Sequence, residues 1–477
     1  MLNRINPNLS VGNAFVLLLS LTAIIFLRFI YQVLSNPLNR LPGPRSAKWT
    51  NLLHNYYSLK GQLPDYVHSL HEKYGPIVRV SPTRVDICDA YAVKEIHKTN
   101  TKYYKTEFYQ RLTAMETDNL FSTADSHFHA ARRRLLASPI ADSALSHHLP
   151  QISNRVNYTI ERISEEMMDR GAADIFKWWL FMATDIIGEL SFGESFKMLE
   201  AGTPTQYSRD LAMLAGIQPI RTIFPTLVKL GAYLPLPLFK STAAAGMRIG
   251  FYAYQSIQRY KTHLEENPEN PKPTLFTKIF DTEKSGLSME DILYEAQGYI
   301  IAGSDTTAVT LTYLIFSVCQ NPQIQAKLVE ELSDLPEPVT DKDLRNLPYL
   351  GNVISEALRL YTAIPFGLPR AVPPEGANFC GYFIPSGVTV STQSFMPERW
   401  QNTTKSMKDM SMPFGGGSRV CIGIHLARIE LRLATALFFR RFPEARISKK
   451  EGMSREDMLM KCFFLMTPKG HRCLIEA

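Results

Sequence analysis

An apolar run near the N-terminus is the first clear pattern along the chain. Residues 11–34 read VGNAFVLLLSLTAIIFLRFIYQVL and contain one charged side chain, Arg28. At 1.5 Å per residue, a helix of this length crosses the roughly 30 Å hydrocarbon core of a bilayer. A cleaved signal peptide is the alternative, but the apolar run ends in Arg28-Phe29-Ile30 rather than in a small-x-small cleavage site. The pattern therefore predicts a membrane anchor.

The charges that flank this run predict its orientation. Arg40, Arg45 and Lys48 follow the apolar run, whereas Arg4 precedes it. Because basic residues favour the cytosolic side of a membrane, we expect the bulk of the chain to lie in the cytosol. Leu41-Pro42-Gly43-Pro44 then predicts a rigid, extended stretch that ends the helix. Since no repeat or linker divides the rest of the chain, we expect an anchor over residues 1–40 and one large domain over residues 41–477.

The periodicity of the remaining chain predicts a mainly α fold of the α+β class, in which helices enclose a small sheet. Ser288 and Asp291 form a capping-box pattern, which predicts that a long helix begins there and runs to about Cys319. Asn321-Pro322 predicts the start of the next helix. The other expected elements are a helix over Pro348–Tyr361, strands over Ile77–Val80, Arg84–Cys88 and Gly381–Thr392, and loops over 234–237 and 267–273.

Composition narrows the classes of function. The 477 residues are 45% hydrophobic and 11% aromatic, which is enough to bury a large core. The net charge of +7 is spread along the chain without a basic tail, so it argues against nucleic acid as a partner. The six cysteines have irregular spacings, and a cytosolic domain keeps its thiols reduced, so we expect no disulfide bonds.

One of these cysteines, Cys421, lies in the glycine-rich stretch FGGGSRVCIG over residues 414–423. A zinc ligand is one possibility, because His425 follows at i+4, but no further ligand pair completes the set. A nucleophile is another, although no base or oxyanion hole is specified nearby. A thiolate that binds haem iron is the third. The third also gives roles to the neighbours: glycines for a tight fold beneath a flat macrocycle, and Arg419 as a cation for a propionate.

Phe414, Gly417, Arg419, Cys421 and Gly423 fit the F-x-x-G-x-R-x-C-x-G haem-binding signature of the cytochrome P450 family. With three further stretches in the family's order, the resemblance covers nearly the whole chain. It implies the cytochrome P450 fold, a helix-rich domain with small β-sheets around a buried haem. It also implies haem b as the cofactor, with Cys421 as the axial iron ligand.

The first of the further stretches is IIAGSDTTAV, residues 300–309, within the long predicted helix. Its polar side chains interrupt an apolar run, so they need partners or water. A structural explanation is that threonine bonds back to the i−4 carbonyl while Asp305 forms an ion pair. The stretch also resembles the family's A-G-x-D-T-T segment on the distal face of the haem. That resemblance implies that Thr306 and Asp305 help to deliver protons during oxygen activation, while Ala302 and Gly303 leave room for dioxygen.

The second stretch is EALR, in which Glu356 and Arg359 share a helix face at i,i+3. An exposed pair of this kind contributes only a few tenths of a kcal/mol, and the sequence alone favours the exposed pair. Pro397-Glu398-Arg399-Trp400 resembles the family's PERF-type motif. The resemblance implies that Glu356, Arg359 and Arg399 form a buried network beneath the proximal side of the haem.

The third stretch is HAARRRLL, residues 129–136, whose basic run is otherwise typical of a solvated helix face. By resemblance, His129 and Arg133 contact haem propionates, as does Arg370 of the LPRAV segment. Neighbouring Arg132 and Arg134 are candidates for a cationic surface that meets an acidic reductase. The family's pattern also suggests substrate contacts, with ordinary core packing as the alternative, from 108–121, Tyr299, Ala302, 363–366 and Phe463-Phe464.

The sequence departs from the family's pattern after Gln393, where about fifteen residues that normally precede the PERF-type motif are missing. The resemblance nevertheless implies a haem-thiolate monooxygenase that inserts one atom of O₂ into an apolar small molecule. Its electrons come from NADPH through a cytochrome P450 reductase. We expect a single-pass protein of the endoplasmic reticulum membrane that acts in secondary-metabolite biosynthesis, as in fungal members. The alternatives are a catalytically impaired haem-binding variant and an oxygen-independent haem-thiolate isomerase or dehydratase.

Overall fold

The computed structural model describes residues 11–113, 117–231, 236–267, 269, 273–277, 279, 286–392 and 411–477. The α-helices in these ranges are α1 (Val11–Leu34), α2 (Leu52–Leu59), α3 (Leu63–Tyr74), α4 (Ala90–His97), α5 (Phe108–Thr113), α6 (Ser126–Ala137), α7 (Asp142–Leu145), α8 (Leu149–Arg170), α9 (Ile175–Phe192), α10 (Met198–Ala201), α11 (Gln206–Ile223), α12 (Pro225–Gly231), α13 (Pro237–Glu266), α15 (Met289–Cys319), α16 (Pro322–Ser333), α17 (Asp341–Leu344), α18 (Pro348–Leu360) and α20 (Ile424–Arg441). The 3₁₀-helices are η1 (Pro37–Arg40), η2 (Arg45–Lys48), η3 (Ser146–His148), η5 (Gly417–Arg419) and η6 (Lys450–Gly452).

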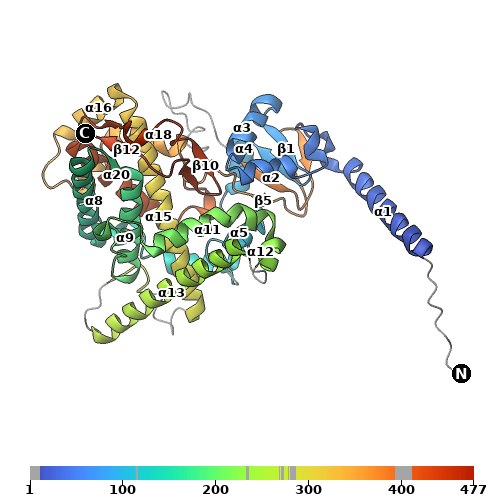
Figure 1. Cartoon of the computed structure of the whole chain (residues 1–477), viewed down its shortest axis with the longest axis horizontal. Helices are drawn as coiled ribbons and strands as arrows, with labels where there is room; N and C mark the ends of the chain where they lie inside the picture. Colours follow the sequence, from blue (N-terminus) through green and yellow to red (C-terminus); the bar gives the residue numbers. More distant parts are fainter. Residues whose placement is uncertain are drawn as a thin grey trace.

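The strands are short and belong to four small sheets. They are β1 (Ile77–Ser81), β2 (Arg84–Ile87), β3 (Tyr104–Lys105), β4 (Ala173–Asp174), β5 (Arg370–Ala371), β6 (Ala377–Phe379), β7 (Tyr382–Ile384), β8 (Thr389–Thr392), β9 (Arg446–Ile447), β10 (Met460–Cys462), β11 (Met466–Pro468) and β12 (Leu474–Glu476). The largest sheet has the order β1-β2-β8-β5-β3, in which only β2 and β8 run parallel. Figure 1 shows this sheet between the helical body and α1.

The long helix α15 is the centre of the helical body (Figure 1). Its predicted start is confirmed: the Ser288 hydroxyl accepts from the Asp291 amide at 3.1 Å, and the Asp291 carboxylate accepts from the Ser288 amide at 3.1 Å. Although its length and apolar composition would suit a membrane span, 67% of its most apolar window is buried inside the protein. It packs against α9, and the main hydrophobic core gathers around the two helices. α15 is therefore a core helix.

Two of the predicted strands are confirmed as β1 and β2, and the further strand structure expected over Gly381–Thr392 is present as two separate strands. The region holds β7, which pairs with β6, and β8, which pairs with β2 and β5. Gly387 separates them at φ +76, a conformation that glycine adopts without strain. The turn redirects the chain into the large sheet, where β8 lies beside Arg370 of β5.

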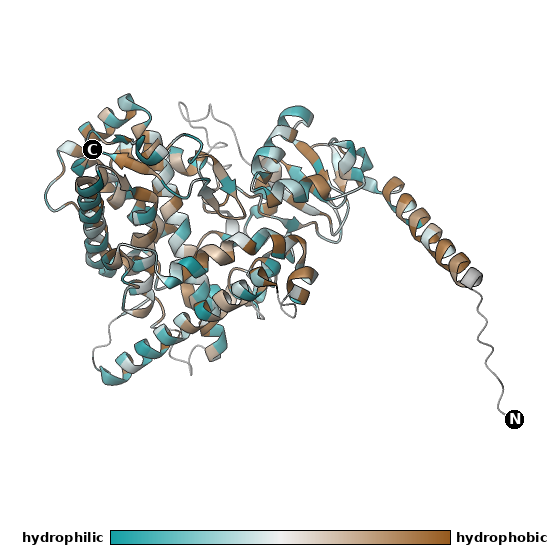
Figure 2. Cartoon of the chain, in the orientation of Figure 1, coloured by the Kyte–Doolittle hydropathy of each residue, from teal (hydrophilic) through white to brown (hydrophobic). Residues whose placement is uncertain are grey.

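The N-terminal helix α1 extends away from the rest of the protein as a nearly continuous apolar rod (Figure 2). Side chains such as Phe15, Leu21 and Phe26 are more than half exposed. The span Ala14–Leu34 has 21 residues with none of its most apolar window buried, so it reaches about 30 Å. Such a surface is compatible with a membrane anchor.

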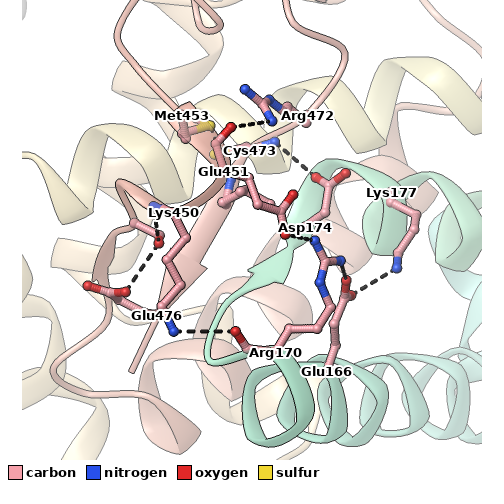
Figure 3. Close-up of polar contacts among 12 residues, drawn as sticks. Glu166, Arg170, Asp174, Lys177, Lys450, Glu451, Met453, Arg472, Cys473 and Glu476 are labelled. Atoms are coloured by element: carbon pink, nitrogen blue, oxygen red, sulfur yellow. Dashed lines mark hydrogen bonds and ion pairs between the residues drawn. The ribbon is translucent and has the colours of Figure 1, made fainter.

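A polar network attaches the C-terminal segment to the helical body (Figure 3). Arg170 of α8 pairs with Glu166 and with Glu451, which follows the last long helix. The Asp174 carboxylate accepts from the Cys473 amide at 2.9 Å, next to the pairing of β12 with β4. These contacts join α8 and the paired strands β4 and β12 to the segment that follows α20.

Candidate active site

The loop that carries Cys421 is closed by its own backbone. The Cys421 amide donates to the Phe414 carbonyl at 2.8 Å, and η5 lies between these two residues. Gly415 and Gly417 have φ values of +74 and +57, which explains why the loop needs glycine at both positions. The Gly423 amide donates to the sulfur of Cys421, just before α20 begins. The loop therefore holds the sulfur in a defined position.

Gly417 has a second reason to be glycine. A Cβ atom at this position would lie 2.2 Å from the His97 carbonyl oxygen and 2.7 Å from the Lys98 carbonyl oxygen. Both are backbone atoms at the C-terminal end of α4, so they cannot move aside as a flexible side chain could. Gly417 thus lets α4 contact the Cys421 loop directly.

The thiol of Cys421 combines accessibility with a desolvated environment. The residue is exposed, yet the surrounding protein desolvates the thiol and raises its pKa. The Gly423 amide and the Arg133 guanidinium act in the opposite direction, because both favour the thiolate. Accessibility together with desolvation indicates a concave region beside the Cys421 loop, which we call the hollow.

Helix α15 also has an accessible residue next to buried ones. Ala302 is exposed, although Ile300 and Ser304 beside it in the helix are buried. Tyr299 lies about one helical turn before Ala302 in α15. The charge of Cys421 is among the causes that raise the pKa of Tyr299. The sequence-predicted residues Cys421 and Ala302 therefore lie in one region, between the thiol loop and the core helix.

Basic side chains gather around this region. Arg133 of α6 donates to the Val420 carbonyl at 2.7 Å, Arg419 donates to the Thr123 carbonyl at 3.0 Å, and Arg370 donates to the Tyr109 hydroxyl at 2.7 Å. These partners are neutral oxygens. Within the described ranges, none of the three guanidinium groups pairs with a carboxylate side chain.

The electrostatic effect of this crowding is seen on His129 and Arg419. Desolvation, Arg419, Lys105 and Arg133 lower the pKa of His129 to about 3. Desolvation and Arg370 lower the pKa of Arg419 to about 10. The sequence-predicted residues are thus brought together as three cations, Arg133, Arg370 and Arg419, beside a neutral His129, and the three cations form no carboxylate ion pair in the described ranges.

Sequence reasoning missed Lys105, which belongs to this cluster. Its ammonium is desolvated and is repelled by Arg370 and Arg419, so its pKa is well below the usual value. A lysine after Tyr103-Tyr104 in a short strand carries no local motif. Only the pairing of β3 with β5, across more than 260 residues, places it beside Arg370.

The polar residues of α15 differ in their bonding. The Thr306 hydroxyl donates to the Ala302 carbonyl at 2.8 Å, which is the backbone-bonded arrangement considered from the sequence. The carboxylate of Asp305 has no hydrogen-bond or ion-pair partner among the described residues. Burial alone raises the pKa of Asp305 to about 6. The structural explanation therefore applies to Thr306 but not to Asp305.

Gly303 packs close to helix α9. A Cβ atom there would lie 2.8 Å from Cγ1 of Ile187, a residue that is 2% exposed. This contact shows that Gly303 allows the close packing of α15 on α9. The expectation that Gly303 also leaves room for dioxygen stays a prediction.

The ion pair predicted in EALR is present on α18. Arg359 Nε donates to the Glu356 carboxylate at 2.8 Å, with side-chain exposures of 8% for Arg359 and 40% for Glu356. The side chain of Arg359 is thus more buried than the arginine of an ordinary surface ion pair would be. Arg399, the third member of the expected network, lies outside the described residues, as does Gln393.

Three segments expected to line a substrate site meet through aromatic rings. Phe108 stacks on Phe366 with ring centroids 5.2 Å apart, and Phe464 lies 6.0 Å from Phe108 and 5.9 Å from Phe121. Tyr299 instead packs against the core. The four phenylalanines, Phe108, Phe121, Phe366 and Phe464, form an aromatic cluster beside Tyr109 and Lys105.

The other interpretations of Cys421 gain no support from its surroundings. The described ranges contain no group of three His, Cys, Asp or Glu side chains that could hold a metal ion, and His425 is exposed. None of the six cysteines, all of which the structure describes, forms a disulfide bond. Burial raises the pKa of Cys462 to about 12, in line with an inert core thiol.

Comparison with known proteins adds independent findings. A family model described as Cytochrome P450 matches residues 41–475. Cytochrome P450 monooxygenase tazI of Aspergillus terreus is 48% identical, over 96% of this chain and 97% of its own length. Cytochrome P450 monooxygenase orf2 of Aspergillus niger is 44% identical, over 97% and 96% of the two chains. Cytochrome P450 monooxygenase aflV of Aspergillus parasiticus is 34% identical, over 92% and 91%.

The alignment with the Aspergillus terreus protein also bears on chain length. The alignment has 474 positions, but it includes only 96% of the 477 residues of this chain, which is about 458 residues. About 16 aligned positions of that relative therefore have no counterpart in this chain. This number agrees in size with the segment expected to be missing after Gln393.

Proposed function

Because the chain belongs to the cytochrome P450 family, we propose that it is a haem-dependent monooxygenase with Cys421 as the iron ligand. The observation that carries this assignment is the Cys421 thiol itself: it is accessible, enclosed by protein and bonded by the Gly423 amide. The chemical class, an oxidoreductase that acts as a monooxygenase, also follows from the names of relatives that match along nearly the full chain.

The residues present fit haem on two sides. Cys421 would bind the iron through its sulfur. The propionates would be held by three cations, Arg133, Arg370 and Arg419, together with His129. The three guanidinium groups now donate to neutral oxygens, and an anion would relieve the repulsion between them. We assign haem b because the resemblance to the cytochrome P450 family implies it.

When bound, haem supplies the redox chemistry that uses two electrons to place one atom of O₂ in a substrate and release the other as water. The protein must then provide protons and exclude bulk water. Asp305, with a pKa of about 6, exchanges a proton with solvent near neutral pH. The Thr306 hydroxyl donates to Ala302, so its oxygen is oriented to accept a hydrogen bond from a water molecule that carries the proton.

The substrate we propose is an apolar small molecule of secondary metabolism, contacted by the Phe108, Phe121, Phe366 and Phe464 rings. The electrons would come from an NADPH-cytochrome P450 reductase. Residues 1–40 would form the anchor, with the catalytic domain over residues 41–477 in the cytosol and the anchor in the endoplasmic reticulum membrane. The exposed apolar surface of α1 supports the anchor. The start of the family match at residue 41 supports the boundary.

The decisive measurement is the reduced, carbon monoxide difference spectrum of membranes that contain the full chain. We expect the strongly red-shifted Soret band of a haem-thiolate protein in the wild type, and its loss in Cys421→Ala. Cys380→Ala is the matched control, because Cys380 is also exposed and free. A red-shifted band that persists in Cys421→Ala would refute the ligand assignment.

Turnover separates this function from its alternatives. Product formation that requires NADPH, reductase and O₂ supports the monooxygenase. Product formation that continues without O₂ would instead indicate an isomerase or dehydratase. A normal thiolate spectrum with no turnover of any substrate in a broad panel of apolar compounds would indicate an impaired variant. The segment missing after Gln393 would then be the first cause to test.

A further inference from the structure

Lys105 lies directly opposite Arg370 in the pairing of β3 with β5. Like charges at directly opposite positions of a strand pair destabilise it. Arg370 is 4% exposed, so solvent does not screen the repulsion well. An antiparallel register that places two basic side chains together is therefore unfavourable unless an anion lies between or beside them.

The surroundings of Lys105 contain little to satisfy an ammonium group. Its Nζ lies 4.4 Å from the ring centroids of both Tyr109 and Phe121, and it donates to the Phe121 carbonyl. In the described ranges it forms no ion pair. Asp118 attracts it, but desolvation together with Arg370 and Arg419 outweighs this attraction and lowers its pKa.

The side chain nevertheless remains partly accessible. Protein atoms still desolvate the ammonium, as they do the Cys421 thiol. Lys105 also acts electrostatically on His129, which connects it to the cluster formed by His129, Arg133, Arg370 and Arg419. One anionic ligand could thus contact Lys105 and that cluster together.

We propose that Lys105 is a cofactor-binding residue whose ammonium donates to a haem propionate beside Arg370. This inference rests on the proposed function, because it takes haem as the ligand. The two propionates carry two negative charges, and a neutral His129 supplies none of the balancing charge. Lys105 completes the set of cations that Arg133, Arg370 and Arg419 begin.

The test compares haem with haem dimethyl ester, in which both propionates are uncharged. Full-length chains produced under haem limitation are loaded with either compound, and its loss to an excess of apomyoglobin is followed by absorbance. Lys105→Met removes the charge while retaining an unbranched side chain. Lys102→Met is the matched control, because Lys102 is nearby, 74% exposed and paired with Glu375 at 2.7 Å.

We expect Lys105→Met to lose haem about 10- to 100-fold faster than the wild type, the range for a hydrogen bond between charged groups. The loss of haem dimethyl ester should be the same in both proteins, and Lys102→Met should behave as the wild type does with both compounds. Lys105→Arg should restore haem retention to within about threefold, which separates loss of charge from misfolding.

Three outcomes overturn the proposal. One is equal loss of haem from Lys105→Met and the wild type. A second is equal acceleration for haem and its dimethyl ester, since that would indicate a structural role. The third is failure of Lys105→Arg to restore retention. The carbon monoxide spectrum of the same samples tests the proposed function separately: a wild type that binds haem without the thiolate band contradicts the Cys421 assignment, whatever Lys105 does.

Discussion

Replacing Gly303 with alanine tests whether α15 and α9 are in closest contact at this point. The new methyl group would lie 2.8 Å from Cγ1 and 3.1 Å from Cδ1 of Ile187. These distances are shorter than ordinary van der Waals contact, and Ile187 is too deeply buried to turn into solvent. The helices must separate or Ile187 must leave its preferred rotamer.

The expected magnitude combines two opposing effects. Overpacking a well-packed core costs about 1–3 kcal/mol. Alanine has a helix propensity about 1 kcal/mol better than glycine, which offsets part of this cost. Gly303→Ala should therefore lower the free energy of unfolding by about 0–2 kcal/mol.

Gly351→Ala is the control that isolates the steric contribution. Gly351 lies in α18, where an added Cβ would meet nothing within 4 Å. This change should stabilise the protein by about 0.5–1 kcal/mol through helix propensity alone. The difference between the two variants should thus be about 1–3 kcal/mol, the overpacking cost by itself.

A second substitution at Ile187 identifies the contact. Ile187→Ala alone should destabilise by about 2–5 kcal/mol because it creates a cavity. Combined with Gly303→Ala, it should cost less than the sum, since the new methyl group partly fills that cavity and coupled neighbours differ from additivity by about 0.5–3 kcal/mol. Unfolding is measured in urea by circular dichroism and by the Soret band, with agreement of the two probes as the check on two-state behaviour.

The reasoning fails if Gly303→Ala behaves as Gly351→Ala does, or if the changes at Gly303 and Ile187 are additive. It also fails if Gly303→Ala leaves stability unchanged but weakens carbon monoxide binding. That last result would show that the new methyl group points into the ligand hollow, as the family resemblance implies.

Two further predictions concern Asp305 and α1. Because the pKa of Asp305 is raised to about 6 in the folded protein from an ordinary value of 3.8, its contribution to stability is complete below pH 4 and is lost as pH rises through 6. Asp305→Asn should therefore raise the free energy of unfolding at pH 7.5 by up to about 3 kcal/mol, which urea midpoints across pH measure. It should also divert electrons from product to peroxide, which the amount of product formed per NADPH measures. A pH profile of stability that is the same in Asp305→Asn and the wild type would contradict the burial argument. Deleting residues 1–34 should move the protein from the membrane to the soluble fraction on centrifugation, because the exposed apolar span Ala14–Leu34 is then gone. Retention in the pellet would indicate a second membrane-binding surface.

Several features could be read from the order of residues because their causes lie within one or two turns of the chain. The capping box at Ser288 stabilises the start of α15 through contacts three residues apart. The apolar run of α1 and the glycine-rich turn before Cys421 are equally local. The family signature then connected that turn to haem, a step that periodicity and composition alone could not make.

The sequence by itself therefore determined the apolar helix α1, the start of the core helix α15 and the glycine-rich turn before Cys421, because each depends on neighbours in the chain. Tertiary structure alone decided three other things: that Gly417 makes room for the end of α4, that Gly303 makes room for Ile187, and that Lys105 lies opposite Arg370. Each of these is a contact between residues more than 100 positions apart. Their chemistry depends on distance and burial, and a linear pattern contains neither until the chain has folded.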